Sequence, residues 1–316
     1  MTRHQTAAIK IILDTDIGDD IDDAIALTFA LGSREFDLLG VTVVYGDVVT
    51  RARIARKMLR LCGRGDVPVA AGYERPMGFD FHPGTVPEEC SQRQAVADDD
   101  EPLDRSPSAP DLIGRIVRAD PGQVHVLTIG AMTNVGAALC ADPSLAGQIA
   151  GVVSLAGYVP PRESRPEWNV RYDPLAARSI AASGVPWTAI GADVQGDSRL
   201  TRDEFAALRD SGSPAARFLL ELIVLMKRHK GGGNPAVRSI DDVESTHVAD
   251  VMSLASFLVP EQMALTAGRI EVDDRGAIAF AADEAGPHRF ALERLAGHAY
   301  RAEILRRLLA AGQPRK

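Results

Sequence analysis

Short apolar runs alternate with segments of helical periodicity through the first two thirds of the chain. Because each run is almost continuously apolar, we expect strands that are buried on both faces, as in a parallel sheet. The predicted strands cover residues 9–13, 38–45, 67–71, 124–129, 151–156 and 187–192.

The segments between these runs have helical periodicity, and several end in glycine or another small residue. They predict helices at residues 22–33, 49–63, 110–119, 133–149 and 173–184. The alternation predicts an α/β fold: an open, mostly parallel sheet with a Rossmann-like core and helices on both faces. Ligands of such sheets bind beyond the carboxyl ends of the strands, so the residues after each strand are the candidates for function.

The remaining segments complete the picture without dividing the chain. Strands near residues 268–274 and 277–283 and a closing helix at 292–311 predict a small C-terminal extension. Residues 73–109 and 229–246 lack periodicity and are predicted loops, either lids over a site or surface insertions. With no linker in the sequence, we expect residues 1–316 to form a single domain.

Composition narrows the classes of protein. A chain with 46% hydrophobic and 25% charged residues is typical of a globular protein with a sizeable core. A net charge of -8 argues against nucleic-acid and acidic-membrane partners. Lys10 interrupts the only early apolar run, and no later segment suits a bilayer, so we expect a soluble cytoplasmic protein. The cysteines Cys62, Cys90 and Cys140 are widely spaced and are interpreted as reduced structural thiols.

An acidic cluster follows the first predicted strand. Acidic residues in a first helical turn complement the helix dipole, which explains one or two of them. Two unit charges about 4 Å apart repel by roughly 1 kcal/mol in water and about 4 kcal/mol near a protein surface, so the whole cluster calls for a cation. Oxygen ligands favour Ca²⁺ or Mg²⁺ over zinc or copper. The cluster consists of Asp14, Asp16, Asp19, Asp20, Asp22 and Asp23.

Taken alone, the cluster is compatible with several chemistries. Residues 19–23, DDIDD, have the diphosphate-binding spacing of prenyl synthases, although that motif belongs on long helices and here a strand precedes it. Residues 14–18, DTDIG, resemble the start of haloacid-dehalogenase-type phosphatases, in which Asp14 would be the nucleophile, with Gly18 in place of Thr or Val. An EF-hand loop is excluded because Gly18 comes one place early and Ile25 holds position twelve.

A third interpretation accounts for more of the chain. The segments DTDIG and DDAIAL, separated by the extra pair Asp19 and Asp20, resemble the amino-terminal signature of the inosine-uridine-preferring nucleoside hydrolase family. Further segments resemble later motifs of that family in the same order, so that the resemblance covers most of residues 9–260. These segments are GVTVVYGDV at 40–48, VPVAAGYERPM at 67–77, LTIGAMTNVGAAL at 127–139 and PEWNVRYDPLAARSIAASGVPWTAIGADV at 166–194.

The resemblance implies a set of metal ligands. Asp16 matches the metal-bound aspartate that also takes a proton from the attacking water, and Asp23 matches a bidentate ligand. Asp22 matches the neighbour that binds metal or ribose. The main-chain carbonyl of Ile129 stands where the family uses a carbonyl ligand, and Asp250 matches the last metal aspartate.

The resemblance also implies contacts with the sugar. Glu167 and Asn169 match ribose-hydroxyl binders. If this piece is extended, their side chains project together and Trp168 turns away into the core. Asp47 replaces the family's asparagine in the turn after the second strand, where we expect an altered sugar contact.

A candidate acid for the leaving group lies near the end of the resemblance. The family often has histidine directly before its last metal aspartate, whereas Ala249 stands there in this chain. His247 lies three residues ahead of Asp250, and on a helix these two positions would share a face. His247 is therefore either the leaving-group acid or a helix cap or surface group.

As a whole, the resemblance implies a Ca²⁺-dependent hydrolase, with Mg²⁺ the second choice, that cleaves the N-glycosidic bond of ribonucleosides or related N-ribosides. It further implies a homodimer or homotetramer. Two alternatives remain open: a metal-dependent sugar- or nucleoside-binding protein without turnover, and the phosphatase.

Overall fold

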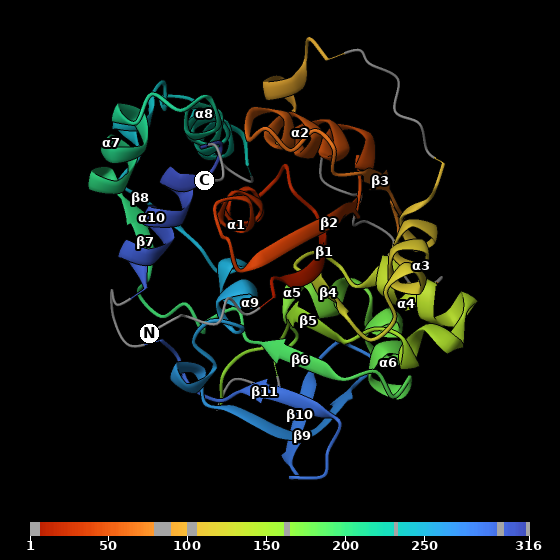
Figure 1. The fold of residues 1–316 in the computed structure, drawn as a ribbon. Coiled ribbons are helices and arrows are strands. Elements are labelled where there is room, and N and C mark those ends of the chain that lie inside the picture. Colours follow the sequence, from red (N-terminus) through yellow and green to blue (C-terminus); the bar gives the residue numbers. More distant parts are fainter. Residues whose placement is uncertain are drawn as a thin grey trace, which may run out of the picture.

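A nine-stranded sheet forms the centre of the protein in the computed structural model (Figure 1), which describes residues 7–78, 90–99, 106–160, 165–230, 233–295 and 300–313. The strand order is β10-β9-β11-β6-β5-β4-β1-β2-β3. The strands are β1 Ile9–Thr15, β2 Phe36–Val43, β3 Val69–Ala71, β4 Val124–Thr128, β5 Gly151–Leu155, β6 Trp187–Ile190, β9 Leu265–Val272, β10 Ile278–Ala282 and β11 His288–Ala291.

The strands from β3 through β6 to β11 pair in parallel, as the apolar runs predicted. The C-terminal extension adds the antiparallel pairs β9 with β11 and β10 with β9. The predicted fold class, an open and mostly parallel sheet with helices on both faces, is confirmed.

The order of strands locates the ligand crevice. From β1 the chain proceeds outwards to β2 and β3, and then returns to place β4 on the other side of β1. This reversal leaves a crevice at the carboxyl ends of β1 and β4, where ligands of open α/β sheets bind. The acidic cluster follows β1, and Ile129 follows β4.

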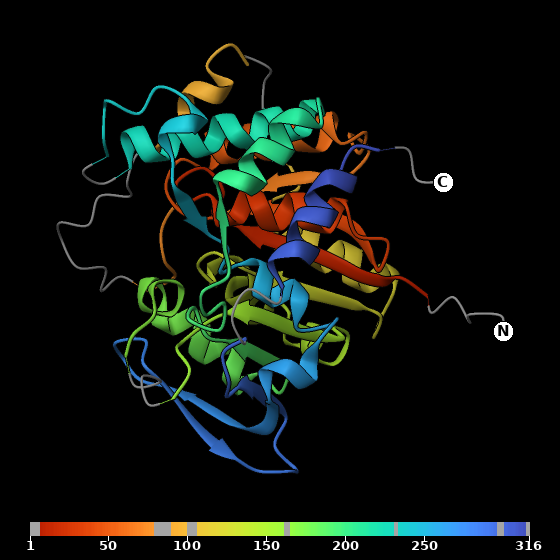
Figure 2. The ribbon, with the colours of Figure 1, turned by 90° about the vertical axis from the view of Figure 1, so that its left-hand side faces the viewer.

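Helices cover both faces of the sheet (Figures 1 and 2). Along β1, Ile11 and Leu13 join one hydrophobic core and Ile12 joins the other, as expected for a strand buried on both sides. The first core is formed with α1 Asp22–Leu31, α2 Val48–Leu61, α7 Arg202–Asp210, α8 Pro214–His229, α9 Val251–Ala255 and α10 Arg301–Ala310. The second is formed with α3 Ala109–Ala119, α4 Thr133–Ala141 and α6 Pro174–Ala182.

Three local predictions need correction. The helix predicted at 133–149 is interrupted at Asp142, which caps a separate 3-10 turn, η2, at Pro143–Gly147. The piece around Glu167 does not continue as a strand: Glu167 itself is extended, but the short helix α5 Trp168–Tyr172 begins directly after it. The closing helix covers only Arg301–Ala310 of the predicted range, of which residues 296–299 lie outside the described part of the chain.

The two predicted loops contain short regular elements. Between β3 and α3 lies a 3-10 turn, η1 Arg93–Val96, and residues 79–89 and 100–105 lie outside the description. The segment after α8 contains η3 Ile240–Asp242 and strand β8 Ser245–His247, which pairs with β7 Arg199–Thr201 in a small antiparallel sheet. A further 3-10 turn, η4 Pro260–Met263, precedes β9. None of the described helices has the length and apolar character needed to span a bilayer.

Candidate active site

A cavity of about 460 Å³ lies at the crevice beyond β1 and β4, and we call it the acidic cavity. Most of the residues that the resemblance singled out line it, although they come from distant parts of the chain. Its lining consists of Asp16, Asp19, Asp20, Asp22, Asp23, Tyr45, Ile129, Leu155, Glu167, Trp168, Asn169, Ala192, Gln195, Lys230, His247, Ala249 and Asp250.

Three buried carboxylates converge on one side of this cavity. Asp22 and Asp23 form the first turn of α1, Asp250 directly precedes α9, and each offers a carboxylate oxygen within 4.8 Å of the others. Asp250 Oδ1 is buried without a hydrogen-bond partner in the described part of the chain. An unpartnered buried oxygen beside two further carboxylates is what an oxygen-ligated cation requires, so the residues present fit a metal ion.

The electrostatics of the three carboxylates agree with this interpretation. Burial, followed by the neighbouring charge of Asp20, raises the pKa of Asp22 to about 6. Burial and the adjacent carboxylates also raise the pKa of Asp23 and of Asp250. A divalent cation would relieve this repulsion and return the groups to their charged forms.

Asp16 and Ile129 lie side by side where β1 and β4 end. The two chains approach closely because residue 130 is glycine: a Cβ there would lie 2.8 Å from the Asp16 nitrogen and 2.9 Å from its Oδ1. Burial raises the pKa of Asp16, and the charge of Arg51 partly offsets the rise. The carbonyl of Ile129 accepts a hydrogen bond from Asn169 Nδ2 at 2.9 Å, which leaves one lone pair for another ligand.

Asp14 does not share this position. Its side chain is fully buried among β1, β2 and α4, where Oδ1 accepts hydrogen bonds from Thr42 Oγ1 at 2.6 Å and Asn134 Nδ2 at 2.8 Å. Burial raises the pKa of Asp14 to about 7. It does not line the acidic cavity, so this geometry opposes the phosphatase interpretation, in which Asp14 would attack the substrate.

The α5 region supplies a further part of the cavity wall. Glu167 caps α5, accepting hydrogen bonds from the Asn169 nitrogen at 3.0 and 3.1 Å and from the Val170 nitrogen at 3.4 Å. Burial raises the pKa of Glu167 to about 8. The expectation that Trp168 packs in the core is wrong: it is 39% exposed, lines the cavity and meets the Tyr45 ring edge-to-face at 6.0 Å. The start of a helix at Trp168 replaces the alternation that an extended strand would have had.

Asp47 lies outside the cavity lining. It caps α2, where its carboxylate accepts hydrogen bonds from the Thr50 nitrogen at 3.1 Å and Thr50 Oγ1 at 2.7 Å, and it also pairs with Arg93 at 3.2 Å. The sequence had suggested that Asp47 contacts the sugar. The geometry does not place its carboxylate among the sugar contacts.

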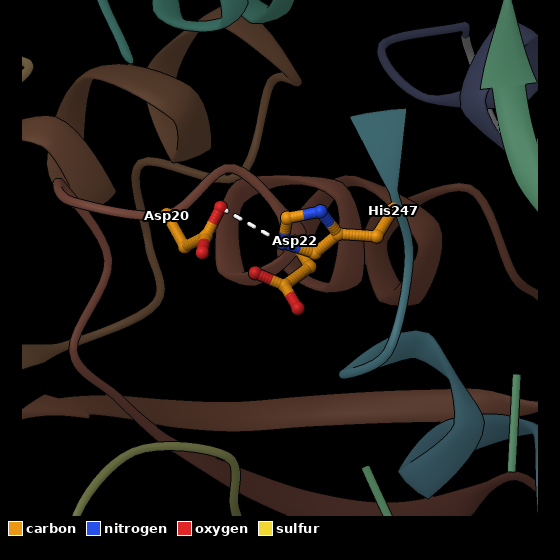
Figure 3. A group of neighbouring side chains, drawn as sticks. All are labelled: Asp20, Asp22 and His247. Atoms are coloured by element: carbon orange, nitrogen blue, oxygen red, sulfur yellow. Dashed lines mark ion pairs between the residues drawn. The ribbon is translucent and has the colours of Figure 1, made fainter. Parts of the chain in front are cut away.

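The extra pair, Asp19 and Asp20, is neutralised by the protein itself. Asp19 Oδ2 pairs with Arg51 at 2.7 Å, and the Arg51 side chain is fully buried. Asp20 pairs with Lys230 at 2.5 Å and with His247 Nε2 at 3.0 Å. Figure 3 shows the Asp20 carboxylate facing the His247 ring, with Asp22 beside them.

These contacts shift the pKa values in opposite directions. Burial alone would raise the pKa of Asp20, but the hydrogen bond from His247 and the charge of Lys230 lower it overall. The same hydrogen bond raises the pKa of His247.

A short segment clamps the backbone of the extra pair. The Gln92 nitrogen donates to the Gly18 carbonyl at 3.0 Å, Ser91 Oγ donates to the Asp19 carbonyl at 3.0 Å, and Gln92 Nε2 donates to the Asp20 carbonyl at 3.0 Å. The Ser91 nitrogen also donates to Asp19 Oδ1 at 3.0 Å. We call residues 90–92 the clamp. It belongs to residues 73–109, which were predicted from the sequence only as a loop.

His247 reaches the cavity from a strand, not from a helix. It ends β8, where it pairs with Arg199 of β7, and Asp250 follows after the strand has ended. The prediction that His247 and Asp250 lie three residues apart on one helix is wrong, although both side chains line the cavity.

Two cationic residues of the site, Arg51 and Lys230, were not predicted from the sequence. Arg51 belongs to an amphipathic helix rich in basic residues, where nothing local distinguishes a buried arginine from an exposed one.

A family model of known proteins matches most of the chain. The sequence model described as "Inosine-uridine preferring nucleoside hydrolase" matches residues 11–301. A pyrimidine-specific ribonucleoside hydrolase, RihA, of Citrobacter koseri is 29% identical over 229 residues, which cover 71% of this chain and 73% of the relative. A probable uridine nucleosidase 2 of Arabidopsis thaliana is 31% identical over 229 residues, covering 68% of each chain.

Solved structures show the same fold. A plant nucleoside hydrolase, PpNRh1, superposes with a TM-score of 0.76 at 24% identity and covers 96% of this chain and 100% of its own. A purine-preferring ribonucleoside hydrolase from Gardnerella vaginalis superposes with a TM-score of 0.75 at 24% identity, covering 96% and 99%.

Proposed function

Since the chain belongs to the inosine-uridine preferring nucleoside hydrolase family, and is thus an N-glycosyl hydrolase, we propose that it is a calcium-dependent enzyme that releases the base from ribonucleosides. The observation that supports calcium most directly is the convergence of Asp22, Asp23 and Asp250 around the unpartnered Asp250 Oδ1. Mg²⁺ is the second choice, because it demands more regular geometry and keeps more of its own water.

The proposed ligands are the carboxylates of Asp16, Asp22, Asp23 and Asp250 and the free lone pair of the Ile129 carbonyl. Thr15 Oγ1 donates to Asp23 Oδ1 at 2.5 Å and so fixes the orientation of that carboxylate. When bound, the cation would polarise water and hold the vicinal hydroxyls of the sugar.

The acidic residues suit the reaction that we propose. Cleavage of an N-glycosidic bond passes through an oxocarbenium-like state, which a negatively charged cavity stabilises. A water oxygen bonds to the anomeric carbon, the bond from that carbon to the base nitrogen breaks, and Asp16 accepts the proton that the water loses. The departing nitrogen needs a proton, and His247, whose pKa Asp20 raises, is the proposed donor.

The proposed sugar-binding residues are Asp22, Glu167 and Asn169. The Asn169 amide group donates to the carbonyls of Ile129 and Leu155, at 2.9 and 3.2 Å, so its nitrogen is fixed. Asn169 therefore connects the proposed carbonyl ligand to the proposed sugar wall. We leave Asp47 out of this set, because capping and pairing occupy its carboxylate.

A panel of common ribonucleosides tests the proposal. Reducing sugar should be released from at least one of them in Ca²⁺, release should stop in chelator, and Ca²⁺ should restore it better than Mg²⁺. The Asp47→Asn variant serves as a matched aspartate control outside the cavity and should behave like wild type. Inactivity over the whole panel, with calorimetry showing that Ca²⁺ is bound, would contradict the proposal and favour a binding protein without turnover.

Two further expectations concern the oligomeric state of the protein and its location in the cell. We propose a homodimer or homotetramer, as the family resemblance implies, and a cytoplasmic location, which the sequence pattern near residue 10 suggested. Light scattering that gives the mass of a single 33.8 kDa chain would rule out the assembly.

A further inference from the structure

A second cavity of about 800 Å³ adjoins the acidic cavity, and we call it the arginine cavity. The two share Tyr45 and Trp168, so the Trp168 ring forms part of the partition between them. The arginine cavity is lined by Tyr45, Pro76, Gly78, Pro166, Trp168, Arg171, Tyr172, Asp173, Pro174, Leu175, Arg178, Asp274 and Arg275.

The C-terminal strands help to build this cavity. The turn between β9 and β10 is seated against α5 at Gly276, which has a φ of 84°. A Cβ on Gly276 would lie 2.7 Å from both the nitrogen and the Cα of Arg171, so only glycine permits this approach. The contact brings Arg275 of the turn and Arg171 of α5 into one cavity.

The charge of the arginine cavity is opposite to that of its neighbour. Its two aspartates are already engaged: Asp173 accepts hydrogen bonds from Thr133 Oγ1 and the Met77 nitrogen, both at 2.8 Å, and Asp274 pairs with Arg178.

The remaining cations are available to a ligand. The Arg171 guanidinium lies 5.0 Å from the centre of the Trp168 ring, and no carboxylate partner is found for it among the described residues. Among the described residues Arg275 makes only a weak 4.0 Å pair with Asp273, and its side chain is 86% exposed. Positive charge beside an exposed aromatic ring therefore lies next to the sugar wall.

The proposed orientation of the sugar depends on how the linings of the two cavities differ. His247 and Lys230 line that cavity but not the arginine cavity, whereas Trp168 lines both. If the base departs towards His247, the opposite edge of the furanose ring faces Trp168. That edge carries C4′ and its exocyclic C5′ group, so a substituent on C5′ points towards the arginines.

We propose that the arginine cavity binds the 5′-phosphate of a phosphorylated substrate, so that the enzyme hydrolyses ribonucleoside 5′-monophosphates as well as nucleosides. This inference rests on the proposed function, because that function sets which end of the sugar faces Trp168. Arginine suits the task, since its planar guanidinium donates two parallel hydrogen bonds to phosphate oxygens. The positive charge also offsets the repulsion between the phosphate and the acidic cavity.

Binding of the sugar products tests the inference without requiring turnover. Calorimetry in Ca²⁺ should show that ribose 5-phosphate binds the wild-type enzyme at least tenfold more tightly than ribose, because hydrogen bonds to a charged group are stronger than those to a neutral one. Arg171→Ala should lower the affinity for ribose 5-phosphate about tenfold and leave that for ribose unchanged. Arg64→Ala, which removes a half-buried arginine paired with Asp66 outside both cavities, should change neither.

Kinetics give the second readout. For one base, kcat/KM for the 5′-monophosphate should equal or exceed that for the nucleoside, and Arg171→Ala should lower only the former. Equal affinity for ribose and ribose 5-phosphate, or an Arg171→Ala loss that is the same for both substrates, would overturn the inference. Hydrolysis of the nucleoside in the same assay tests the proposed function separately, so the two failures are distinguishable.

Discussion

Two pairs of aspartates in one short stretch have opposite environments. Asp19 and Asp20 each meet a cation supplied by the protein, Arg51 and Lys230 respectively. Asp22 and Asp23, separated from the first pair by Ile21, face Asp250 instead. The first pair carries charge that the fold itself neutralises, whereas the second pair carries charge that is left for a ligand.

The comparison shows why the extra pair does not merely add to the repulsion. A buried ion pair is costly to break, because the remaining charge keeps its desolvation penalty without a partner. The clamp and Arg51 therefore fix the loop that leads into α1, and α1 presents the metal-site carboxylates in its first turn. Substitutions should separate the stabilising role of the first pair from the proposed metal-binding role of the second.

Asp23→Asn should have the largest effect on activity. It removes one proposed metal ligand while preserving shape, so kcat/KM on a nucleoside should fall by about 10⁴-fold and calcium binding should weaken sharply. In chelator the variant should unfold at a higher temperature than wild type, because one carboxylate of a repelling cluster has become neutral. Steady-state rates, calorimetry and thermal unfolding measure the three outcomes. A variant that binds calcium normally would remove Asp23 from the site.

Arg51→Met should have the largest effect on stability. It leaves Asp19 buried without its cation and removes the arginine donor to the carbonyls of Ile17 and Tyr45. Breaking a buried pair in this way costs about 3–5 kcal/mol, measured by urea unfolding. The double variant Arg51→Met with Asp19→Asn should recover part of the loss. If the double variant were as unstable as the sum of the two single ones, the pairing would not be the cause.

His247→Gln tests the proposed proton donor. Nucleoside hydrolysis should fall by about 10²-fold, the contribution typical of a general acid. A riboside with p-nitrophenolate as leaving group departs without a proton, so its rate should change by less than about threefold. Equal losses for both substrates would assign His247 to positioning Asp20 and not to proton transfer.

Gln92→Ala tests the clamp. It removes the side-chain donor to the carbonyls of Asp19 and Asp20, at 3.3 and 3.0 Å, so unfolding should become easier by about 1–2 kcal/mol. Calcium affinity should fall only a few-fold, since Asp22 and Asp23 are still held by α1. Gln94→Ala, in the neighbouring 3-10 turn, serves as the control. A stability unchanged by Gln92→Ala would show that the clamp does not hold this loop.

Much of the fold and part of the candidate site could be predicted from local pattern. Apolar runs gave the parallel strands, and the acidic run after the first strand pointed to Asp16, Asp22 and Asp23, all of which line the acidic cavity. The prediction for Trp168 was wrong because strand alternation and the first turn of a short helix look alike over three residues. The prediction for Asp47 changed because a side chain that caps a helix cannot be recognised until the helix start is placed.

The sequence by itself determined the family, the alternation of strands and helices, and the gathering of carboxylates at one strand end, because these depend on side-chain type and short spacing. Only the tertiary structure decided which carboxylates are neutralised. Arg51 lies 32 positions from Asp19, and Lys230 lies 210 positions from Asp20, so their pairing depends on how the sheet and helices pack. The same packing buries Asp14, exposes Trp168 and brings the β9–β10 turn against α5, since contacts between distant segments fix burial and the local electric field.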